Sequence, residues 1–528
     1  MPGMDSGTQT ASPGLAETVA WAEQLHRENH QLRARLETLQ HQLDWLKRQV
    51  FGRKSEQRLL EVPGEQMSLG EYVGATQPQA SPAVQVIAAH TRRPARESAG
   101  EDEAALFFDE SVPVQTIEVP DPQLAGAGPE EYEIIGEKIS YRLAQRPGSY
   151  VILKYVRRLT KRRDDQSLHC PPAPKGVLDN SRADVSFIAG LLVDKFAYHQ
   201  PLYRQHQRLK DSGVRVSRAW LTGLVHSAAA LLEPIYQAQL ASVRQSRVKA
   251  MDETPIKAGS KAKGQMKTGY FWPIYGEADE VVFPFYPTRA ARCVLDSLGQ
   301  SPPDGAVLIS DGYSAYTRYA NKSGLTHAQC WAHTRRQFVK AHNAEPEAVA
   351  QALDAIGELY AVEAHIREHG LTGQAKQRYR VEHAKPVVEA FFAWAEKTLA
   401  DNALLPSNPL TQAIGYALER RAALEVYLAD PEVPIETNHQ ERTLRAIPMG
   451  RKNWLFCWTE VGAKYVGIIQ SLLVTCRLHG INPYDYFVDV LQRIDRHRAC
   501  EVHRLTPRLW KQEFAGDPLR SPLHTVGV

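Results

Sequence analysis

The chain has 528 residues, of which 43% are hydrophobic and 23% are charged, a composition typical of a globular protein with several domains. Its formal net charge is only +3, which by itself indicates no partner. The six cysteines are scattered and form no C-x-x-C pair, which excludes a disulfide scaffold and a four-cysteine zinc ribbon. No signal peptide is visible and no stretch approaches about 18 consecutive apolar residues. We therefore expect a cytoplasmic protein without membrane contact.

The N-terminal region predicts a coiled coil. Residues 1–20 are small and polar and are predicted to be disordered. A leucine then recurs every seventh residue, at Leu25, Leu32, Leu39 and Leu46. Asn29 occupies one of the other seam positions, where a polar residue fixes register and favours a parallel dimer. The pattern predicts a leucine zipper over 21–58 that forms a homodimer, or a higher oligomer, through residues 21–51. The alternative is an amphipathic helix packed on its own domain.

A linker and a basic segment follow the predicted zipper. Residues 59–107 are rich in Pro, Gly and Ala and then acidic, which is typical of a linker. Residues 108–172 are predicted to be β-rich. Within them, 141–163 contains eight Lys or Arg and no acidic residue, a local charge that suits phosphate contacts. The candidate DNA-binding residues here are Arg157, Arg158, Arg162 and Arg163. The alternative is a solvated strand face.

Residues 173–245 have helical patterns. A helix over Gln200 to Lys210, a turn ending at Gly213 and a second helix capped by Ser217 resemble a helix-turn-helix. In that arrangement Arg218 is placed to contact DNA. Any helical hairpin gives a similar pattern, so ordinary packing is the alternative.

Two aspartates stand out in the next region. From residue 246 the sequence predicts three antiparallel strands, the second and third over 268–275 and 281–286. Helix, strand, helix, strand and helix follow, which is the order of a ribonuclease-H-like domain. Asp252 ends the first strand and Asp311 ends the fourth, and these strands are neighbours in that fold. Two aspartates and a third carboxylate can hold two Mg²⁺ or Mn²⁺ ions about 3.5–4 Å apart for phosphoryl transfer. The alternative is that each aspartate merely caps the element that follows it.

The sequence resembles the transposases of the insertion sequence 66 family, bacterial mobile-element enzymes of the Asp-Asp-Glu type. The matching stretches are Asp252-Glu253-Thr254-Pro255, Ser310-Asp311-Gly312-Tyr313, Cys330-Trp331-Ala332-His333, Gly450 to Phe456, Tyr198 to Arg204 and Leu478 to Tyr484. They occur in family order over roughly residues 21–495. The resemblance implies a multidomain α/β protein with a ribonuclease-H-like catalytic core. The core would comprise 246–345 and 431–456, with a helical insertion over 346–430 and a C-terminal helical region over 457–528.

The third acid follows from the same resemblance. By pattern alone, Glu436 and Glu441 are both candidates. The family motif Asp-Asn-Asn-x-x-Glu-Arg, lined up on Pro434-Ile435, assigns the glutamate to Glu441, with Glu436 at the motif's aspartate. Arg445 lies one helical turn from Glu441 and is placed to meet the DNA backbone.

The sequence departs from the family at the zinc-finger-like segment, which usually carries two cysteine pairs. Here residues 118–172 offer only His169 and Cys170. Because two adjacent ligands cannot close a tetrahedral site, zinc is not expected. For Cys330 and His333 we favour structural support of the active site over half a zinc site. Arg451, Lys452 and Trp454 are candidate DNA contacts, with an interface loop as the alternative.

The leading hypothesis is a Mg²⁺-dependent transposase that cuts element ends and joins the 3′-hydroxyl to target DNA. It would act in the cytoplasm at the nucleoid, with DNA and possible accessory proteins of the same element as partners. One rival is a ribonuclease-H-like nuclease or resolvase without strand joining. Another is a DNA-binding dimer that has lost its catalytic activity.

Overall fold

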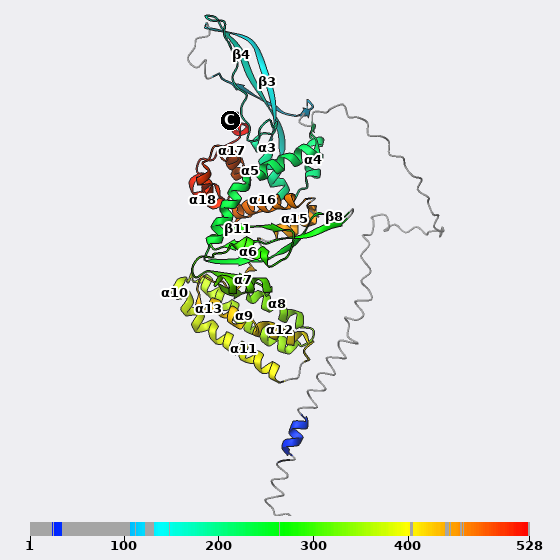
Figure 1. Ribbon diagram of the computed structural model, residues 1–528, viewed down its shortest axis with the longest axis vertical. Coiled ribbons are helices and arrows are strands. Elements are labelled where there is room, and N and C mark those ends of the chain that lie inside the picture. The colour runs from blue at the N-terminus through cyan, green and yellow to red at the C-terminus, as the bar shows by residue number, and fades with distance from the viewer. Residues whose placement is uncertain are drawn as a thin grey trace, which may run out of the picture. The chain divides into compact units, whose positions relative to one another are not determined.

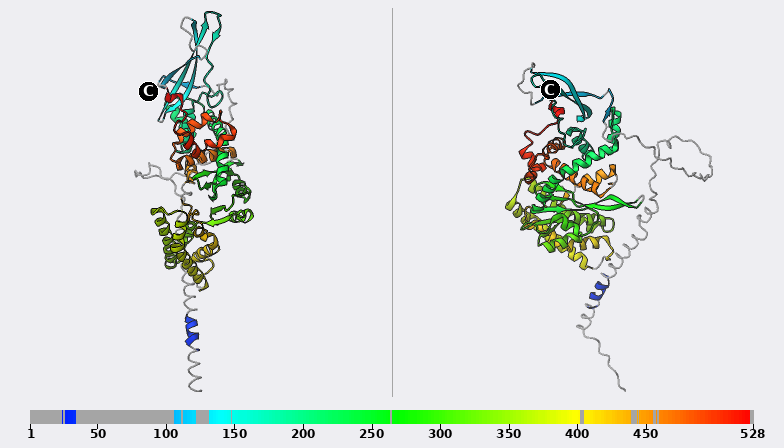
Figure 2. Two further views of the ribbon diagram at one scale, coloured as in Figure 1. Left: turned by 90° about the vertical axis from the view of Figure 1, so that its left-hand side faces the viewer. Right: turned by 45° about the horizontal axis from the view of Figure 1, so that its top comes forward.

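The protein is a mixed α/β chain that folds into two compact units (Figures 1 and 2). The computed structural model describes residues 24, 26–33, 106–110, 112–121, 131–146, 148–262, 265–401, 405–438, 443, 445–454, 457 and 459–525. One unit comprises residues 1–93 and 331–431, and the other comprises 94–330 and 432–528. Of the predicted zipper, residues 24 and 26–33 are helical, and the rest lies outside the described residues.

A five-stranded sheet organises the larger unit, in the order β11-β10-β7-β13-β14. These strands are β7 (Val248–Met251), β10 (Ile274–Gly276), β11 (Glu280–Val282), β13 (Val307–Ser310) and β14 (Thr326–Gln329). β10 runs antiparallel to both of its neighbours, whereas β7, β13 and β14 are parallel to one another. The strands that lead into Asp252 and Asp311 are therefore adjacent, as the sequence predicts.

Prolines break the strands that we predicted over 268–275 and 281–286. Each divides in two, because proline donates no backbone hydrogen bond and leaves the ladder. The Trp272 amide donates to the Pro284 carbonyl at 2.8 Å, and the Asp252 amide donates to the Pro273 carbonyl at 3.3 Å. The three antiparallel strands of the central sheet therefore all bend at the level of Asp252, Pro273 and Pro284. Beyond the bend they continue as a second sheet of order β12-β9-β8, formed by β8 (Thr254–Ala262), β9 (Gln265–Phe271) and β12 (Phe285–Tyr286).

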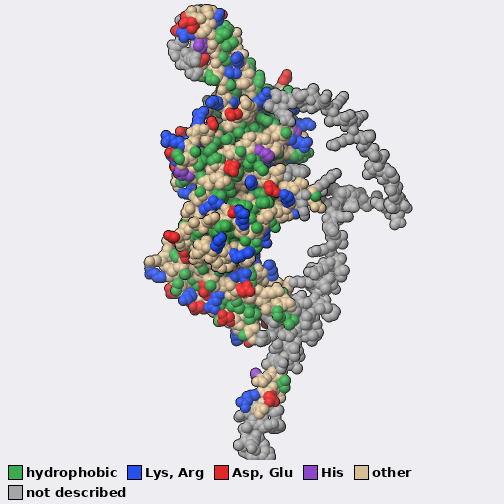
Figure 3. All heavy atoms as spheres, viewed as in Figure 1, with side chains coloured by type: hydrophobic (Ala, Val, Ile, Leu, Met, Phe, Trp, Pro, Cys, Tyr) green, Lys and Arg blue, Asp and Glu red, His purple; other side chains and the backbone are tan. Residues whose placement is uncertain are grey.

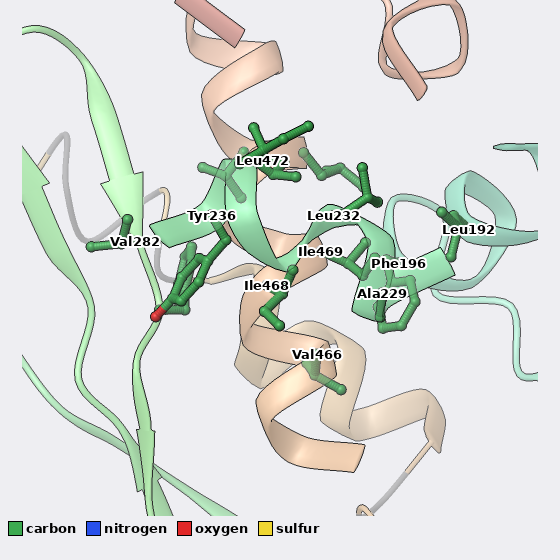
Figure 4. Close-up of a cluster of buried hydrophobic side chains, with 14 of the residues drawn as sticks. Leu192, Phe196, Ala229, Leu232, Tyr236, Val282, Val466, Ile468, Ile469 and Leu472 are labelled. Atoms are coloured by element: carbon green, nitrogen blue, oxygen red, sulfur yellow. The ribbon is translucent and has the colours of Figure 1, made fainter. Parts of the chain in front are cut away.

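Two long helices, α5 (Arg218–Gln245) and α16 (Glu460–Leu478), form the centre of the core in this unit. Figure 4 shows Leu232 and Tyr236 of α5 among Ile468, Ile469 and Leu472 of α16, with Leu192 and Phe196 of α3 (Val185–Phe196) on one side and Val282 on the other. By length and composition α16 is apolar enough to cross a membrane, but 67% of its apolar stretch is buried inside the protein. Its apolar character is thus explained by the core.

α16 also satisfies the edge strand of the sheet. β11 is at the end of the strand order and would otherwise present unpaired backbone groups. The Val281 amide donates to the Thr475 hydroxyl at 3.1 Å, and the Phe283 amide donates to the Ser471 hydroxyl at 2.9 Å. Gln239 of α5 donates to the Val281 carbonyl at 2.7 Å. Side chains of two helices therefore replace a sixth strand.

This close approach predicts a large effect of Gly467→Ala on stability. A Cβ at Gly467 would lie 2.3 Å from the Phe283 carbonyl oxygen, a backbone atom that cannot rotate away. We expect the free energy of unfolding to fall by about 3 kcal/mol, the upper range for overpacking. The measurement is urea unfolding followed by tryptophan fluorescence. Gly223→Ala in α5 is the matched control, because a Cβ there meets nothing within 4 Å. Equal stability of the two variants would contradict this packing.

The remaining strands of this unit form a four-stranded sheet and a small two-stranded one. The larger contains β2 (Val114–Val119), β3 (Tyr132–Arg146), β4 (Ser149–Arg162) and β5 (Leu168–His169); β1 (Phe107–Phe108) pairs with β6 (Val214–Arg215). Strands β2 to β5 lie within residues 108–172, the segment that the sequence predicts to be β-rich. β3 and β4 form a long ribbon that extends from the rest of the unit (Figures 1 and 2).

The predicted helix-turn-helix corresponds to α4 (Leu202–Asp211) and α5. Ser217 caps α5, since its hydroxyl accepts from the Trp220 amide at 3.0 Å. The helix then runs for 28 residues, far beyond a short second helix. The other helices are α6 (Arg292–Leu298), α7 (Ser314–Ser323), α15 (Ala446–Trp454), α17 (Pro483–Arg493), the 3₁₀ helix η4 (Ala499–Leu505), α18 (Pro507–Glu513) and α19 (Pro522–Thr525).

The other unit contains the region predicted as a helical insertion. Its helices are α8 (Trp331–Ala341), α9 (Pro346–Glu368), α10 (Gly373–Tyr379), the π-helix η3 (Arg380–Ala384), α11 (Lys385–Ala400), α12 (Pro409–Leu418) and α13 (Arg421–Ala429). Arg380 is fully buried and makes a two-pronged ion pair with Glu363 at 2.7 and 2.9 Å. It also donates to the Tyr427 carbonyl at 2.7 Å. This buried charge pair joins α9, η3 and α13.

Candidate active site

The structure brings Asp252 and Asp311 together and adds a third carboxylate, Glu253. Oxygen atoms of the three side chains lie within 4.8 Å of one another. Across the described part of the chain, this is the only group of three or more His, Cys, Asp or Glu that could hold a metal ion. Carboxylate oxygens are hard donors, which suit Mg²⁺ or Mn²⁺ better than softer metals. The donor set therefore fits the divalent ions expected from the sequence.

Strand ends determine how the two aspartates are oriented. One Asp252 oxygen accepts from the Glu253 amide at 2.8 Å, and one Asp311 oxygen accepts from the Tyr313 amide at 2.9 Å. Such turns are common where Asp follows a strand. Ser310, just before Asp311, lies 2.8 Å from His327 Nε2 on the neighbouring strand β14. Both aspartates therefore stabilise the local turn, as the capping alternative predicts, and also converge on one position.

Glu253 was not identified as a site residue from the sequence. Its side chain is only 5% exposed. Arg289 forms an ion pair with one of its oxygens, and the Tyr316 hydroxyl donates to the other at 2.6 Å. A cation and a phenol thus compensate this buried carboxylate.

Aromatic side chains hold Arg289 beside the carboxylates. Its guanidinium lies 4.3 Å from the centre of the Tyr313 ring, and the Tyr313 hydroxyl donates to the Arg289 carbonyl at 2.8 Å. Burial raises the pKa of Tyr316 well above its ordinary value, and the nearby carboxylates of Glu253, Asp252 and Asp311 raise it further. Tyr316 therefore stays protonated and acts as a donor. Tyr313 and Tyr316 are three residues apart, a helical spacing that could have indicated this support.

The residue predicted as the third acid, Glu441, lies outside the described residues. The chain leading to it is anchored next to the end of β14. Cys330 is 1% exposed, and its sulfur accepts from the Thr437 amide at 3.3 Å and from the Thr437 hydroxyl at 3.4 Å. Glu436 is partly buried and accepts from the Asn438 side-chain amide. These bonds join Cys330 to the segment before Glu441, while His333 lies in α8 of the other unit. The structural role favoured for both residues stays a prediction.

The basic segment on β4 is partly neutralised by acidic residues of the neighbouring strand β2 and of the turn after β4. Arg158 pairs with Glu118 at 3.2 Å, and Arg162 pairs with Asp164 at 3.0 Å. Arg157 is partly buried and donates to the Pro171 carbonyl at 3.2 Å, whereas Arg163 is exposed. Figure 3 shows acidic and basic side chains next to each other at the end of the ribbon, at the top of the view. The charge of 141–163 alone overstates the basic character of this surface.

The other predicted DNA-binding residues lie at helix ends. Arg218 is exposed at the first residue of α5. Arg445 and Lys452 are exposed before and within α15. Arg451 donates to the carbonyl of Pro255, three residues after Asp252. Trp454 is the last residue of α15.

These features define a mixed α/β protein with a carboxylate site suited to divalent ions and basic side chains nearby. Comparison with known families identifies the chain more closely. It belongs to the IS66 family of transposases, because the family model described as "Transposase IS66 family" matches residues 180–465, more than half of the chain. The "IS66 C-terminal element" matches residues 471–508, and "Transposase C of IS166 homeodomain" matches residues 38–117. The resemblance inferred from the motifs is confirmed, and the family supports a role as a transposase.

Two similar proteins come from Sinorhizobium fredii (strain NBRC 101917 / NGR234). The uncharacterized protein y4jD is 28% identical over 516 residues, which cover 94% of this chain and 98% of y4jD. The uncharacterized protein y4hP is 26% identical over 507 residues, which cover 90% of this chain and 89% of y4hP. The similarity therefore extends over nearly the whole length of both relatives.

Proposed function

We propose that the protein is a DNA transposase that cuts the ends of a bacterial insertion sequence and joins them to target DNA. The observation that carries this proposal is the pair Asp252 and Asp311 at the ends of adjacent parallel strands, in a chain of the IS66 family. The proposal includes a ribonuclease-H-like core, which the order β11-β10-β7-β13-β14 supports. It also includes action in the cytoplasm, at the nucleoid.

The reaction consists of two phosphoryl transfers. In the first, a water oxygen attacks a phosphodiester at the element end, the bond from phosphorus to the 3′-oxygen breaks, and that oxygen takes up a proton. In the second, the resulting 3′-hydroxyl attacks a target phosphodiester and releases a target 3′-hydroxyl. Bound Mg²⁺ or Mn²⁺ would activate the attacking oxygen and stabilise the leaving oxygen. Asp252, Asp311 and Glu441 would hold these ions.

Glu253 and Arg289 have a supporting part in this proposal. Because Glu253 is bonded to Arg289 and Tyr316, it orients the turn that carries Asp252. Cys330 would act similarly on the segment leading to Glu441, through Thr437. Glu253 and Cys330 can both act in this way without touching DNA.

A strand-transfer assay distinguishes the proposal from its rivals. Labelled duplexes with the terminal repeats of the encoding element are incubated with the full-length protein, Mg²⁺ and a supercoiled target plasmid. Cleavage followed by joining to the plasmid supports a transposase. Cleavage without joining indicates a nuclease or resolvase, and binding without cleavage indicates a DNA-binding protein that has lost activity. Accessory proteins of the element are added in a parallel reaction.

The proposed dimer seam predicts a change in oligomeric state. Leu32 is 64% exposed in the single chain, as expected for a seam residue that awaits a partner. The double variant Leu32→Pro and Leu39→Pro should be monomeric, because each proline costs about 3 kcal/mol in a helix interior. Sedimentation velocity measures the result, with Leu32→Ala and Leu39→Ala as the milder control. An unchanged dimer in the proline variant would place the interface outside residues 21–51.

A further inference from the structure

A lysine-rich hairpin begins directly beside the carboxylates. It consists of β8 and β9, which pair antiparallel, and β8 starts two residues after Asp252. Residues 254–271 contain four lysines, Lys257, Lys261, Lys263 and Lys267, and no acidic residue. Figure 1 shows β8 extending outward from the central sheet. This concentration of charge contrasts with the nearly balanced chain as a whole.

A second basic element is bonded to this hairpin. Residues 443–459 contain Arg445, Arg451 and Lys452 and no acidic residue. The Cys457 amide donates to the Lys257 carbonyl at 2.9 Å, and the Gly259 amide donates to the Cys457 carbonyl at 3.2 Å. These bonds form where β8 departs from regular pairing, with Gly259 at a φ of +74°. Backbone hydrogen bonds therefore join the hairpin to residues 443–459, the segment that contains α15.

The hairpin has a buried side and a basic side. Ile256 and Phe271 are buried in the core. Lys257, whose side chain alternates with Ile256, is exposed and donates to the Thr268 hydroxyl at 2.8 Å. Lys267 pairs with Glu460 at 3.1 Å, and its side chain remains 50% exposed. Glu460 therefore partly compensates Lys267, whereas the exposed Lys257 and the basic residues of α15 add positive charge to this side.

We propose that this hairpin–α15 surface, formed by Lys257, Arg445, Arg451 and Lys452, binds the phosphate backbone of duplex DNA next to the reacting phosphate. The inference rests on the proposed function, which brings DNA to Asp252 and Asp311. Carboxylates repel phosphates, so a basic surface beside them is needed to hold the duplex in place. DNA fits better than an acidic protein because this surface adjoins the carboxylate site.

The geometry gives the expected reach of this contact. Lys257 follows Asp252 by five residues, and an extended chain rises about 3.3 Å per residue. Its backbone therefore lies at most about 16 Å from that of Asp252. At a rise of about 3.4 Å per base pair, this corresponds to about five base pairs of duplex. Lys257 should contact a phosphate within about five base pairs of the cut.

The first experiment measures DNA affinity separately from cleavage. A fluorescein-labelled 40-base-pair duplex carrying the terminal repeat is titrated with the full-length protein in Ca²⁺ at several KCl concentrations. The double variant Lys257→Ala with Lys452→Ala should bind about 10-fold more weakly. Its salt slope should fall by about 1.8, or 0.9 for each phosphate that is no longer neutralised. The matched control, Lys340→Ala with Lys397→Ala, removes two exposed lysines of the helical unit and should leave both values unchanged.

Unchanged affinity and slope in the Lys257 and Lys452 variant would overturn the inference. A second experiment tests position: a thiol tethered to the DNA backbone should form a disulfide with Lys257→Cys when it is about five base pairs from the cut, and not from 15 base pairs away. Crosslinking only at the distant position would also overturn it. Both readouts are independent of cleavage. A chain that binds here but never cuts DNA would therefore reject the proposed function and retain this surface.

Discussion

Each of the substitutions Asp252→Asn and Asp311→Asn should abolish DNA cleavage and leave DNA affinity nearly intact. Asparagine has almost the same shape, and its carbonyl oxygen can still accept from the Glu253 or Tyr313 amide. The turns at the strand ends should therefore survive. What is removed is the negative charge that binds a divalent ion. Ion-mediated stabilisation of several kcal/mol corresponds to a fall in cleavage rate of about 10³-fold or more.

The measurement is cleavage of labelled element ends in Mg²⁺, with DNA affinity determined in Ca²⁺ on the same proteins. Glu253→Gln is the informative control, because this carboxylate belongs to the same cluster but is bonded to Arg289 and Tyr316. It should keep measurable cleavage and lose about 1–3 kcal/mol of stability, because a neutral amide makes weaker hydrogen bonds to Arg289 and Tyr316 than the buried carboxylate does. Full cleavage by either aspartate variant would reject the assignment of the site.

The aspartate pair could be predicted because it depends on strand order, and strand order follows from hydrophobic pattern. Val307 to Ser310 is buried throughout and parallel to β7, as expected for a central strand. The bend at the site was missed although its cause is visible in the sequence. Pro273 and Pro284 each interrupt a predicted strand, and together they turn three strands at the level of Asp252.

The partners of the site residues could not be predicted, because they come from distant parts of the chain. Arg289 is 36 residues from Glu253, and Thr437 is 107 residues from Cys330. The same reason explains why the sequence overestimates the positive charge of the basic segment over 141–163. Glu118, which neutralises Arg158, is 40 residues earlier and is brought alongside by the parallel pairing of β2 and β4. Local charge counts do not include such neighbours.

Glu441→Gln should lose cleavage as completely as the aspartate variants, whereas Glu436→Gln should stay active. The carboxylate of Glu436 accepts from Asn438, within the segment that Thr437 anchors to Cys330, so its bond serves the local fold. Glu441 and Arg445 are four residues apart and share a helical face if this segment is helical. Arg445 is exposed, while Ile447 nearby is fully buried.

The two variants are compared in one cleavage assay, together with their melting temperatures. Glu436→Gln is expected to lower the melting temperature slightly, since the hydrogen bond to Asn438 is weakened, while cleavage in Mg²⁺ continues. Glu441→Gln is expected to fold as the unmodified protein does and to bind element ends without cutting them. An active Glu441→Gln beside an inactive Glu436→Gln would move the third metal ligand to Glu436. That result would change the ligand set and leave the transposase reaction itself unaffected, because either glutamate completes a carboxylate site with Asp252 and Asp311.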